Sequence, residues 1–233
     1  MAAMLKIERI KAISLDLDDT LWPIWPTIER AERVLHDWLA VNAPATASRY
    51  ASPQALREVR EAVGRQRPEL AHDMTALRRE SIRIALSSAG DDPGLAGAAF
   101  DVFIAERHNV SFYPDALPAL EFLAARYPLV SLSNGNAEPA RLGLGPFFVA
   151  SVAAREVGIS KPDPRIFHVA AQAVGVQPEE VLHVGDDALL DVIAACAAGM
   201  QAAWVNRGDA RWPHEPTPHL ELADLSELVA ALG

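Results

Sequence analysis

The chain has 233 residues, of which 50% are hydrophobic and 22% charged, and this ordinary composition excludes an intrinsically disordered or collagen-like protein. A chain of this length forms one large domain or a domain with an insert, and it buries a full core without disulfides or structural metals. Its formal net charge of −10 argues against nucleic acid or an anionic membrane as a partner, because both require a basic excess. A small anionic substrate remains compatible, provided that local cations or a metal offset the acidic background.

The compartment is indicated by the single cysteine, Cys196, which excludes an intrachain disulfide and favours a reducing environment. The most apolar run, residues 192–205, is too short to span a bilayer. No apolar stretch precedes a small-residue cleavage site near the N-terminus, so we expect no signal peptide. These features predict a soluble, cytoplasmic protein, and they carry no signal of its oligomeric state.

The first half of the chain reads as one strand followed by helices. Residues 11–17 form a short apolar run that predicts a buried strand, and residues 27–41 place hydrophobic side chains at helical spacing. Ser52 and Pro53 are typical of the start of a further helix. Helices are also predicted over 75–89, which Gly90 ends, and over 95–104.

After residue 113 the pattern alternates between strands and helices. Strands are predicted at 129–133, 147–150, 181–185 and 202–205, and helices at 117–125, 164–174, 189–198 and from Asp224 onward. Such alternation is typical of a parallel sheet covered by helices on both faces. We therefore predict an α/β fold, a Rossmann-like core of residues 1–21 and 114–233 with an all-helical domain inserted at 22–113.

Polar residues follow four of the expected strands and helix starts, where an open α/β sheet binds its ligands. Asp16 and Asp18 leave the first strand on the same face, which suits Mg²⁺ or a nucleophile with an acid/base partner, although a solvated turn would look alike. Ser133 and Asn134 end the second strand, where a hydroxyl and backbone N–H groups can hold a phosphoryl oxygen. Taken alone, that segment is an ordinary strand and turn.

Two further positions lie beyond the middle of the chain. Lys161 precedes Pro162 ahead of a helix, and by itself it reads as a surface lysine. Asp186 and Asp187 stand where a strand turns into a helix, with Asp191 in the first turns of that helix. Asp187 is also a candidate N-cap.

Together, the D-x-D-x-T pattern at 16–20, the Ser-Asn pair at 133–134, Lys161-Pro and G-D-D at 185–187 with Asp191 resemble the four motifs of the haloacid dehalogenase-like hydrolase superfamily. The motifs occur in the superfamily's order and extend over the whole chain. The insert lies between the first two motifs, where that superfamily carries its helical cap. The resemblance implies that residues 22–113 are a cap that selects the substrate and controls the access of water.

The resemblance also implies roles for the motif residues. Asp16 would attack phosphorus and form an aspartyl-phosphate, and Asp18 would serve as general acid and base. Lys161 would pair with Asp16 and, with Ser133, bind the transferred phosphoryl group. The implied cofactor is Mg²⁺. Its predicted site comprises Asp16, the backbone carbonyl of Asp18, Asp186 and Asp191, where Asp191 either lies behind the metal or orients Lys161.

The remaining candidates concern substrate recognition. Thr20 and Asn134 are assigned to the substrate-binding set with Ser133. Trp22 is either part of a stiff hinge into the insert or a side chain that lines the substrate cleft. Arg78 or Arg79 either belongs to a solvated charged face or contacts the substrate. Which of Asp187 and Asp191 contacts the metal stays open. For His183, inside an apolar strand, we expect a core or site-edge histidine rather than a metal ligand.

Asp18 favours phosphoryl transfer, because a leaving alkoxide needs a proton and a leaving halide does not. At a finer level the chain resembles bacterial phosphatases of flavin mononucleotide and 5-amino-6-(5-phospho-D-ribitylamino)uracil, on segments such as 182–187 and 218–220. The prediction is a phosphomonoesterase acting on a small phosphorylated metabolite. Alternatives are a phosphatase of another small substrate (phosphoglycolate, a sugar phosphate or a nucleotide), a 2-haloacid dehalogenase and a non-catalytic binding module.

Overall fold

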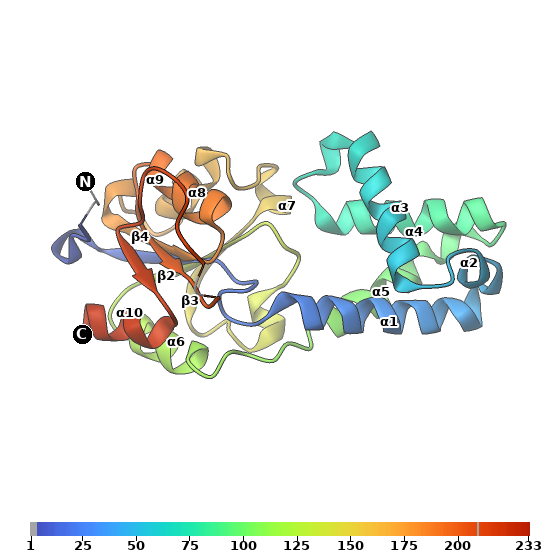
Figure 1. Cartoon of the computed structure of the whole chain (residues 1–233), viewed down its shortest axis with the longest axis horizontal. Coiled ribbons are helices and arrows are strands. Elements are labelled where there is room, and N and C mark those ends of the chain that lie inside the picture. The colour runs from blue at the N-terminus through green and yellow to red at the C-terminus, as the bar shows by residue number, and fades with distance from the viewer. Residues whose placement is uncertain (1–3, 209) are drawn as a thin grey trace. The chain divides into compact units, whose positions relative to one another are not determined.

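The computed structural model describes residues 4–208 and 210–233, which fall into two compact units (Figure 1). An α/β unit comprises Met1–Pro23 and Ser111–Gly233, and a helical unit comprises Ile24–Val110. Both boundaries differ slightly from the predicted positions, because Trp22 at the first and Phe112 at the second belong to the α/β unit. The side chain of Trp22 is fully buried, with its ring edge-on to that of Phe112 at a centroid distance of 5.7 Å.

The α/β unit is built on a single sheet of six parallel strands in the order β3-β2-β1-β4-β5-β6. The strands are β1 (Ala12–Leu15), β2 (Leu129–Ser133), β3 (Phe148–Ala153), β4 (Val181–Gly185), β5 (Gln201–Val205) and β6 (Leu220–Leu222). The predicted Rossmann-like sheet is confirmed. β6 was not predicted from the sequence, because three residues at a sheet edge are too few to show a hydrophobic period.

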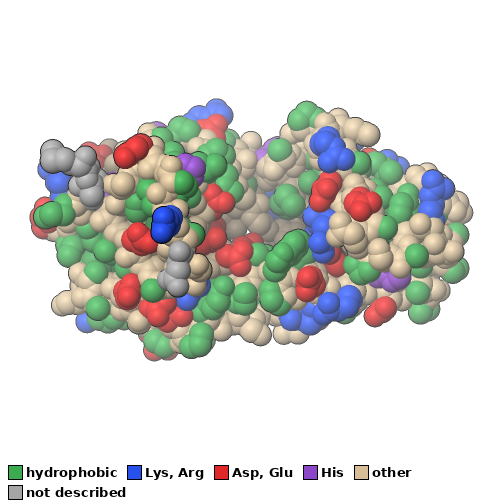
Figure 2. All heavy atoms as spheres, in the orientation of Figure 1, with side chains coloured by type: hydrophobic (Ala, Val, Ile, Leu, Met, Phe, Trp, Pro, Cys, Tyr) green, Lys and Arg blue, Asp and Glu red, His purple; other side chains and the backbone are tan. Residues whose placement is uncertain are grey.

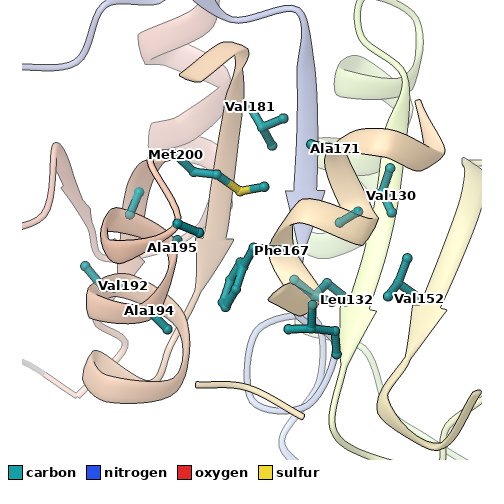
Figure 3. Close-up of a cluster of buried hydrophobic side chains, with 14 of the residues drawn as sticks. Val130, Leu132, Val152, Phe167, Ala171, Val181, Val192, Ala194, Ala195 and Met200 are labelled. Carbon is teal, nitrogen blue, oxygen red and sulfur yellow. The ribbon is translucent and has the colours of Figure 1, made fainter. Parts of the chain in front are cut away.

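Helices cover both faces of this sheet, α8 and α9 on one side and α6 and α10 on the other (Figure 1). The α/β unit contains α6 (Ala116–Ala124), α7 (Ala154–Val157), α8 (Pro164–Ala173), α9 (Ala194–Ala197) and α10 (Leu225–Leu232). Phe167 and Ala171 of α8 pack with Val130 and Leu132 of β2 in a hydrophobic core of this unit (Figure 3). This apolar layer supports the strands whose ends carry the motif residues.

The helix predicted over 189–198 is divided. A π-helical turn spans Ala188–Ile193, and α9 follows directly. The Asp187 carbonyl accepts the N–H of Asp191 at 3.0 Å and that of Val192 at 3.2 Å, the second being the longer i+5 bond of a π turn. Asp191, a residue of the fourth motif, lies within this wider turn.

The helical unit has its own core. It contains α1 (Ile24–Asn42), α2 (Pro44–Arg49), α3 (Pro53–Gln66), α4 (Met74–Ala89) and α5 (Ala96–Arg107). Ser52 caps α3 by accepting the N–H of Ala55, and Gly90 ends α4 with φ of 90°, a conformation that favours glycine. Leu35, Ile82 and Phe103 are among the buried side chains that hold α1, α4 and α5 together.

The surface carries the mixture of charged and hydrophobic side chains that the composition indicates. Figure 2 shows acidic side chains interspersed with basic and hydrophobic ones over the face that it draws. Within residues 4–208 and 210–233, no helix is both long and apolar enough to cross a membrane.

Candidate active site

The strand order brings the predicted site residues together. β1 lies between β2 and β4, so the segments that follow Leu15, Ser133 and Gly185 emerge side by side at one edge of the sheet. A cavity of about 180 Å³ opens there, lined by residues of all four motifs, among them Asp16, Ser133, Lys161 and Asp186. The motifs are far apart in sequence and meet only in the folded chain.

Lys161 is the centre of the site. Its ammonium lies 2.5 Å from Asp16 Oδ1 and 2.6 Å from Asp191 Oδ1, and all three side chains are buried. Burial opposes the charge of Lys161, but the two carboxylates outweigh it and raise the pKa of its ammonium. A buried cation held by two acids is the opposite of the surface lysine that the local sequence indicated.

The two acids that share Lys161 differ in their proton affinity. Burial, together with Asp191, Asp186 and Asp18, raises the pKa of Asp16 well above its ordinary value, although Lys161 opposes the shift. Burial acts in the same direction on Asp191, but Lys161 and a hydrogen bond from His183 outweigh it and lower its pKa. Asp191 therefore stays ionised to lower pH than Asp16 does. The negative charge of Asp16 is only partly balanced by Lys161.

The backbone of Lys161 is clamped by Asn134. The Asn134 Nδ2 donates to the Lys161 carbonyl at 2.9 Å, and its Oδ1 accepts the Lys161 N–H at 2.8 Å. Both ends of the carboxamide are thus occupied, so the side chain that we assigned to substrate binding positions the lysine. Ser133 is buried at 4% exposure, and its Oγ accepts the N–H of Gly135 at 3.0 Å, so its hydroxyl hydrogen remains available as a donor.

Asp18 stands in a tight turn after β1. The indole Nε1 of Trp22 donates to Asp18 Oδ1 at 2.9 Å, and the Asp19 N–H donates to the Trp22 carbonyl at 2.8 Å. Asp19 adopts a left-handed φ of 57°, which aspartate tolerates better than most residues. Trp22 is completely buried, so the structure assigns it to orienting Asp18 and not to the wall of a cleft.

Asp186 is held from two directions. The hydroxyl of Thr20, another residue assigned to the substrate, donates to Asp186 Oδ1 at 3.2 Å and is fully buried. The indole of Trp204 donates to the Asp186 carbonyl at 2.7 Å. Burial, followed by the charges of Asp191 and Asp19, raises the pKa of Asp186 to about 7.

The donor set fits a divalent cation. Asp16, Asp186 and Asp191 each offer a carboxylate oxygen within 4.8 Å of the others, and oxygen ligands of this kind suit Mg²⁺. Burial, followed by the neighbouring carboxylates, raises the pKa values of Asp16 and Asp186, and a cation bound between them would oppose both shifts. The Asp18 carboxylate is not in this group, and the role of its backbone carbonyl remains a prediction.

The remaining two acids of the fourth motif have other partners. Asp187 Oδ1 caps the π-helical turn by accepting the N–H groups of Leu189 and Leu190, both at 2.8 Å, as its sequence position indicated. Asp191 Oδ2 accepts the Asp187 N–H at 3.0 Å. Two of the three carboxylates grouped above, those of Asp16 and Asp186, are therefore freer to bind a metal than that of Asp191.

Arg78 lies inside the helical unit. It is 7% exposed, its guanidinium lies 3.5 Å from the buried Glu32, and it stacks 3.7 Å from the ring centroid of Phe103. These contacts give Arg78 a packing role in its own unit, in place of the substrate contact that we predicted for it. Arg79 is exposed.

Sequence reasoning missed two residues that build the site. Ser14 of β1 and Trp204 of β5 are apolar-strand residues by position, and neither belongs to a motif. Ser14 bonds to His183, and Trp204 bonds to the backbone of Asp186. A buried hydroxyl or indole requires a partner, and that requirement is the only signal that could have drawn attention to them.

Fold and site together define an α/β enzyme that gathers a carboxylate pair, a lysine and further acids at one edge of a parallel sheet. A family model described as haloacid dehalogenase-like hydrolase matches residues 10–199. The chain is 36% identical over 232 residues to the 5-amino-6-(5-phospho-D-ribitylamino)uracil phosphatase YigB of Escherichia coli (strain K12), covering 96% of this chain and 97% of that protein. The chain belongs to the haloacid dehalogenase-like hydrolases.

Both branches of this family occur among the similar proteins. The (S)-2-haloacid dehalogenase 1 of Pseudomonas sp. (strain CBS-3) is 34% identical over 166 residues, which are 67% of this chain and 70% of that protein. A solved structure of a 2-haloacid dehalogenase from Pseudomonas syringae pv. Tomato DC3000 has a TM-score of 0.87 and 38% identity, covering 95% of this chain and 98% of that one. The likenesses establish a hydrolase with phosphatases among its relatives, and they do not choose between the two chemistries.

Proposed function

We propose that the protein is a Mg²⁺-dependent phosphomonoesterase that works through an aspartyl-phosphate on Asp16. The observation that carries the proposal is Asp18, a second carboxylate that lines the same cavity as Asp16. The indole Nε1 of Trp22 orients it by donating to its Oδ1 at 2.9 Å. Transfer of a phosphoryl group from an alcohol requires a proton donor for the leaving oxygen, and Asp18 supplies it. A nucleophilic carboxylate without this partner would suit a leaving group that departs as a stable anion.

In the first step an Asp16 oxygen bonds to phosphorus while the bond from phosphorus to the alcohol oxygen breaks. Asp18 gives its proton to that oxygen and then takes a proton from water, which attacks phosphorus and releases Asp16 and phosphate. Lys161, 2.5 Å from Asp16, reduces the repulsion between the anionic nucleophile and the anionic substrate, and the Ser133 hydroxyl donates to a phosphoryl oxygen. When bound by Asp16 and Asp186, Mg²⁺ supplies further neutralisation of charge at this point.

Carbon–halogen hydrolysis is the second candidate, favoured by the dehalogenases among the similar proteins. The substitution Asp18→Asn separates the two. It removes the general acid, so turnover of a phosphomonoester should fall by about 100-fold or more. Dehalogenation of 2-chloropropionate needs no protonation of the leaving group and should survive the change. Release of halide by the wild-type protein with no release of phosphate from any phosphomonoester would reject the proposal.

The substrate that we propose is 5-amino-6-(5-phospho-D-ribitylamino)uracil or flavin mononucleotide. The support is the match to the E. coli phosphatase, which extends over 96% of this chain and 97% of that protein and includes the helical unit. A panel that adds phosphoglycolate, sugar phosphates and nucleotides tests this choice. A higher kcat/KM for one of those compounds would replace the proposed substrate and leave the phosphatase assignment intact.

The nucleophile is tested by Asp16→Asn, which keeps the size of the side chain and removes the attacking anion. We expect no measurable turnover of p-nitrophenyl phosphate and an unchanged circular dichroism spectrum, because Asp191 still pairs with Lys161 at 2.6 Å. Borohydride reduction during turnover of the wild-type protein should label Asp16. A label on another residue would reject the mechanism, as would full activity in the presence of a chelator.

A further inference from the structure

The imidazole of His183 connects the sheet interior to the charged site. This residue lies in the middle of β4, is completely buried, and meets the ring of Phe167 edge-on at a centroid distance of 5.0 Å. Its Nδ1 lies 2.8 Å from Ser14 Oγ in the neighbouring strand β1. Its Nε2 lies 3.2 Å from Asp191 Oδ1. Both ring nitrogens are therefore engaged.

The partner of Nε2 determines where the ring carries hydrogen. A nitrogen lone pair directed at a carboxylate oxygen would be repelled by it, so Nε2 must hold a hydrogen and donate it to Asp191. The Ser14 hydroxyl is then free to donate to Nδ1, which keeps this arrangement in place from the other side. No other hydrogen-bond partner is needed to satisfy the ring in its apolar surroundings.

Asp191 connects His183 to the nucleophile Asp16 through Lys161. Its Oδ1 accepts from His183 and from Lys161, and the same lysine lies 2.5 Å from Asp16. Its Oδ2 is fixed by the Asp187 N–H at 3.0 Å. Without the imidazole, one of three donors that orient this carboxylate would be lost, and Lys161 would no longer be held in one place between the two acids.

We propose that His183, locked by Ser14, is a positioning residue that orients Asp191 and thereby fixes Lys161 against the nucleophile Asp16. The kinetic part of this inference rests on the proposed function, whereas the hydrogen bond itself does not. A buried histidine that only fills space would use neither nitrogen in this way. This series of hydrogen bonds links five residues from two strands, two loops and the π-helical turn, and it ends at the reacting carboxylate.

The experiment compares His183→Gln with His183→Met. Glutamine places an amide N–H at the same number of bonds from the backbone as Nε2, and methionine has nearly the same size without any donor. If His183 positions Asp191, we expect kcat for p-nitrophenyl phosphate to fall about tenfold or more in the Met variant and by less than about threefold in the Gln variant, with KM little changed in both. Ser14→Ala should lower kcat in the same direction but by less.

A packing role predicts the opposite order, because methionine suits an apolar environment better than glutamine does. Equal activities, or a Met variant more active than the Gln variant, would therefore overturn the proposal. Thermal unfolding of both variants identifies a general loss of folding. If a folding defect obscures the kinetics of the Met variant, the Ser14→Ala variant and the spectrum described next decide.

Nitrogen NMR of the wild-type protein tests the hydrogen bond without reference to activity. The ring signals of His183 are identified by their absence in the His183→Gln variant. We expect Nε2 to carry a hydrogen that exchanges slowly with solvent. A ring with Nε2 unprotonated would overturn the proposal. If the wild-type protein hydrolyses no phosphomonoester, the proposed function fails, and this spectrum alone decides the role of His183.

Discussion

At the scale of single residues, the site places several carboxylates around one ammonium group, that of Lys161. Lys161 lies within 2.6 Å of both Asp16 and Asp191, and a buried cation of this kind is stable only because two carboxylates offset its desolvation. Asp186 lies outside this arrangement, and the Thr20 hydroxyl donates to its side chain. The pKa values of Asp16 and Asp186 are thus raised and that of Asp191 is lowered, according to what each carboxylate contacts.

The raised pKa of Asp186 predicts a pH-dependent metal affinity. Its pKa is raised from 3.8 to about 7, so at pH 6 the metal-free protein carries a proton that Mg²⁺ must displace. Mg²⁺ binding should weaken as the pH falls through about 7 and should release protons there. Calorimetric titration in two buffers of different ionisation enthalpy measures this release, and the release should diminish in Asp186→Asn.

A fall in pH, which weakens Mg²⁺ binding, has the opposite effect on the stability of the metal-free fold. Between the unfolded value of 3.8 and the folded value of about 7, the folded chain binds a proton that the unfolded chain does not. This group therefore stabilises the metal-free protein increasingly as the pH falls from 7 toward 4.

The outcome that would contradict the metal prediction concerns affinity. A Mg²⁺ affinity that is constant between pH 5.5 and 8 would contradict the assignment of Asp186 as a ligand.

At the scale of elements, the end of β4 requires a glycine for reasons of space. A Cβ on Gly185 would lie 2.3 Å from Asp191 Cγ and 2.4 Å from its Oδ2. Gly185→Ala should therefore displace Asp191 and lower kcat by at least about tenfold, since a misplaced carboxylate no longer holds Lys161. Steady-state kinetics on p-nitrophenyl phosphate measure the loss.

The matched control for this change is Gly158→Ala. Gly158 has a left-handed φ of 75°, and nothing lies within 4 Å of its added Cβ. Alanine there costs about 1 kcal/mol of backbone strain and should leave kcat unchanged. If both variants lose kcat equally, the effect at Gly185 is one of general stability and the spatial argument fails.

The packing of α4 within the helical unit leads to a different prediction for Arg78 than its sequence did. Glu32 of α1 accepts hydrogen bonds from Arg57 and Arg60 of α3 and also pairs with Arg78. Burial, followed by the nearby charge of Arg60, lowers the pKa of Arg78 to about 9. We expect Arg78→Ala to lower the free energy of unfolding by about 1–3 kcal/mol, from the lost contacts with Glu32 and Phe103.

Urea unfolding measures this change, and Arg79→Ala is its control. Arg79 is exposed and stacks loosely on Phe100 at 5.4 Å, so its removal should change stability by less than about 0.5 kcal/mol. If Arg78→Ala keeps wild-type stability and raises KM only for a large substrate, the packing role is wrong. The substrate contact predicted from the sequence would then be supported.

At the scale of the whole molecule, two units with separate hydrophobic cores lie in one chain, and the motif residues belong to the α/β unit. A metal held by Asp16 and Asp186 should stabilise that unit by mass action. Hydrogen exchange with and without Mg²⁺ should show added protection in the segments around 16–22 and 181–192 and little change in the core of the helical unit. Protection confined to residues 24–110 would place the metal elsewhere.

The sequence by itself determined the class of fold, most element positions and the identity of the motif residues. Strand and helix periods are local properties. β2 and β4 agree with their predicted bounds because short, mostly apolar segments are buried on both faces of a parallel sheet. Caps such as Asp187 and stops such as Gly90 are equally local, since each acts on its own few neighbours.

Tertiary structure alone decided how these residues are used. From its sequence Lys161 is a surface side chain, but in the structure it pairs with two acids from segments far away in the sequence. Asn134 is likewise a turn residue by sequence, whereas its carboxamide bonds to the Lys161 backbone. Trp22 and Arg78 became buried positioning and packing groups because long-range contacts decide which face of a residue meets solvent. Charge state follows the same rule, since desolvation and nearby charges depend on neighbours that no local pattern specifies.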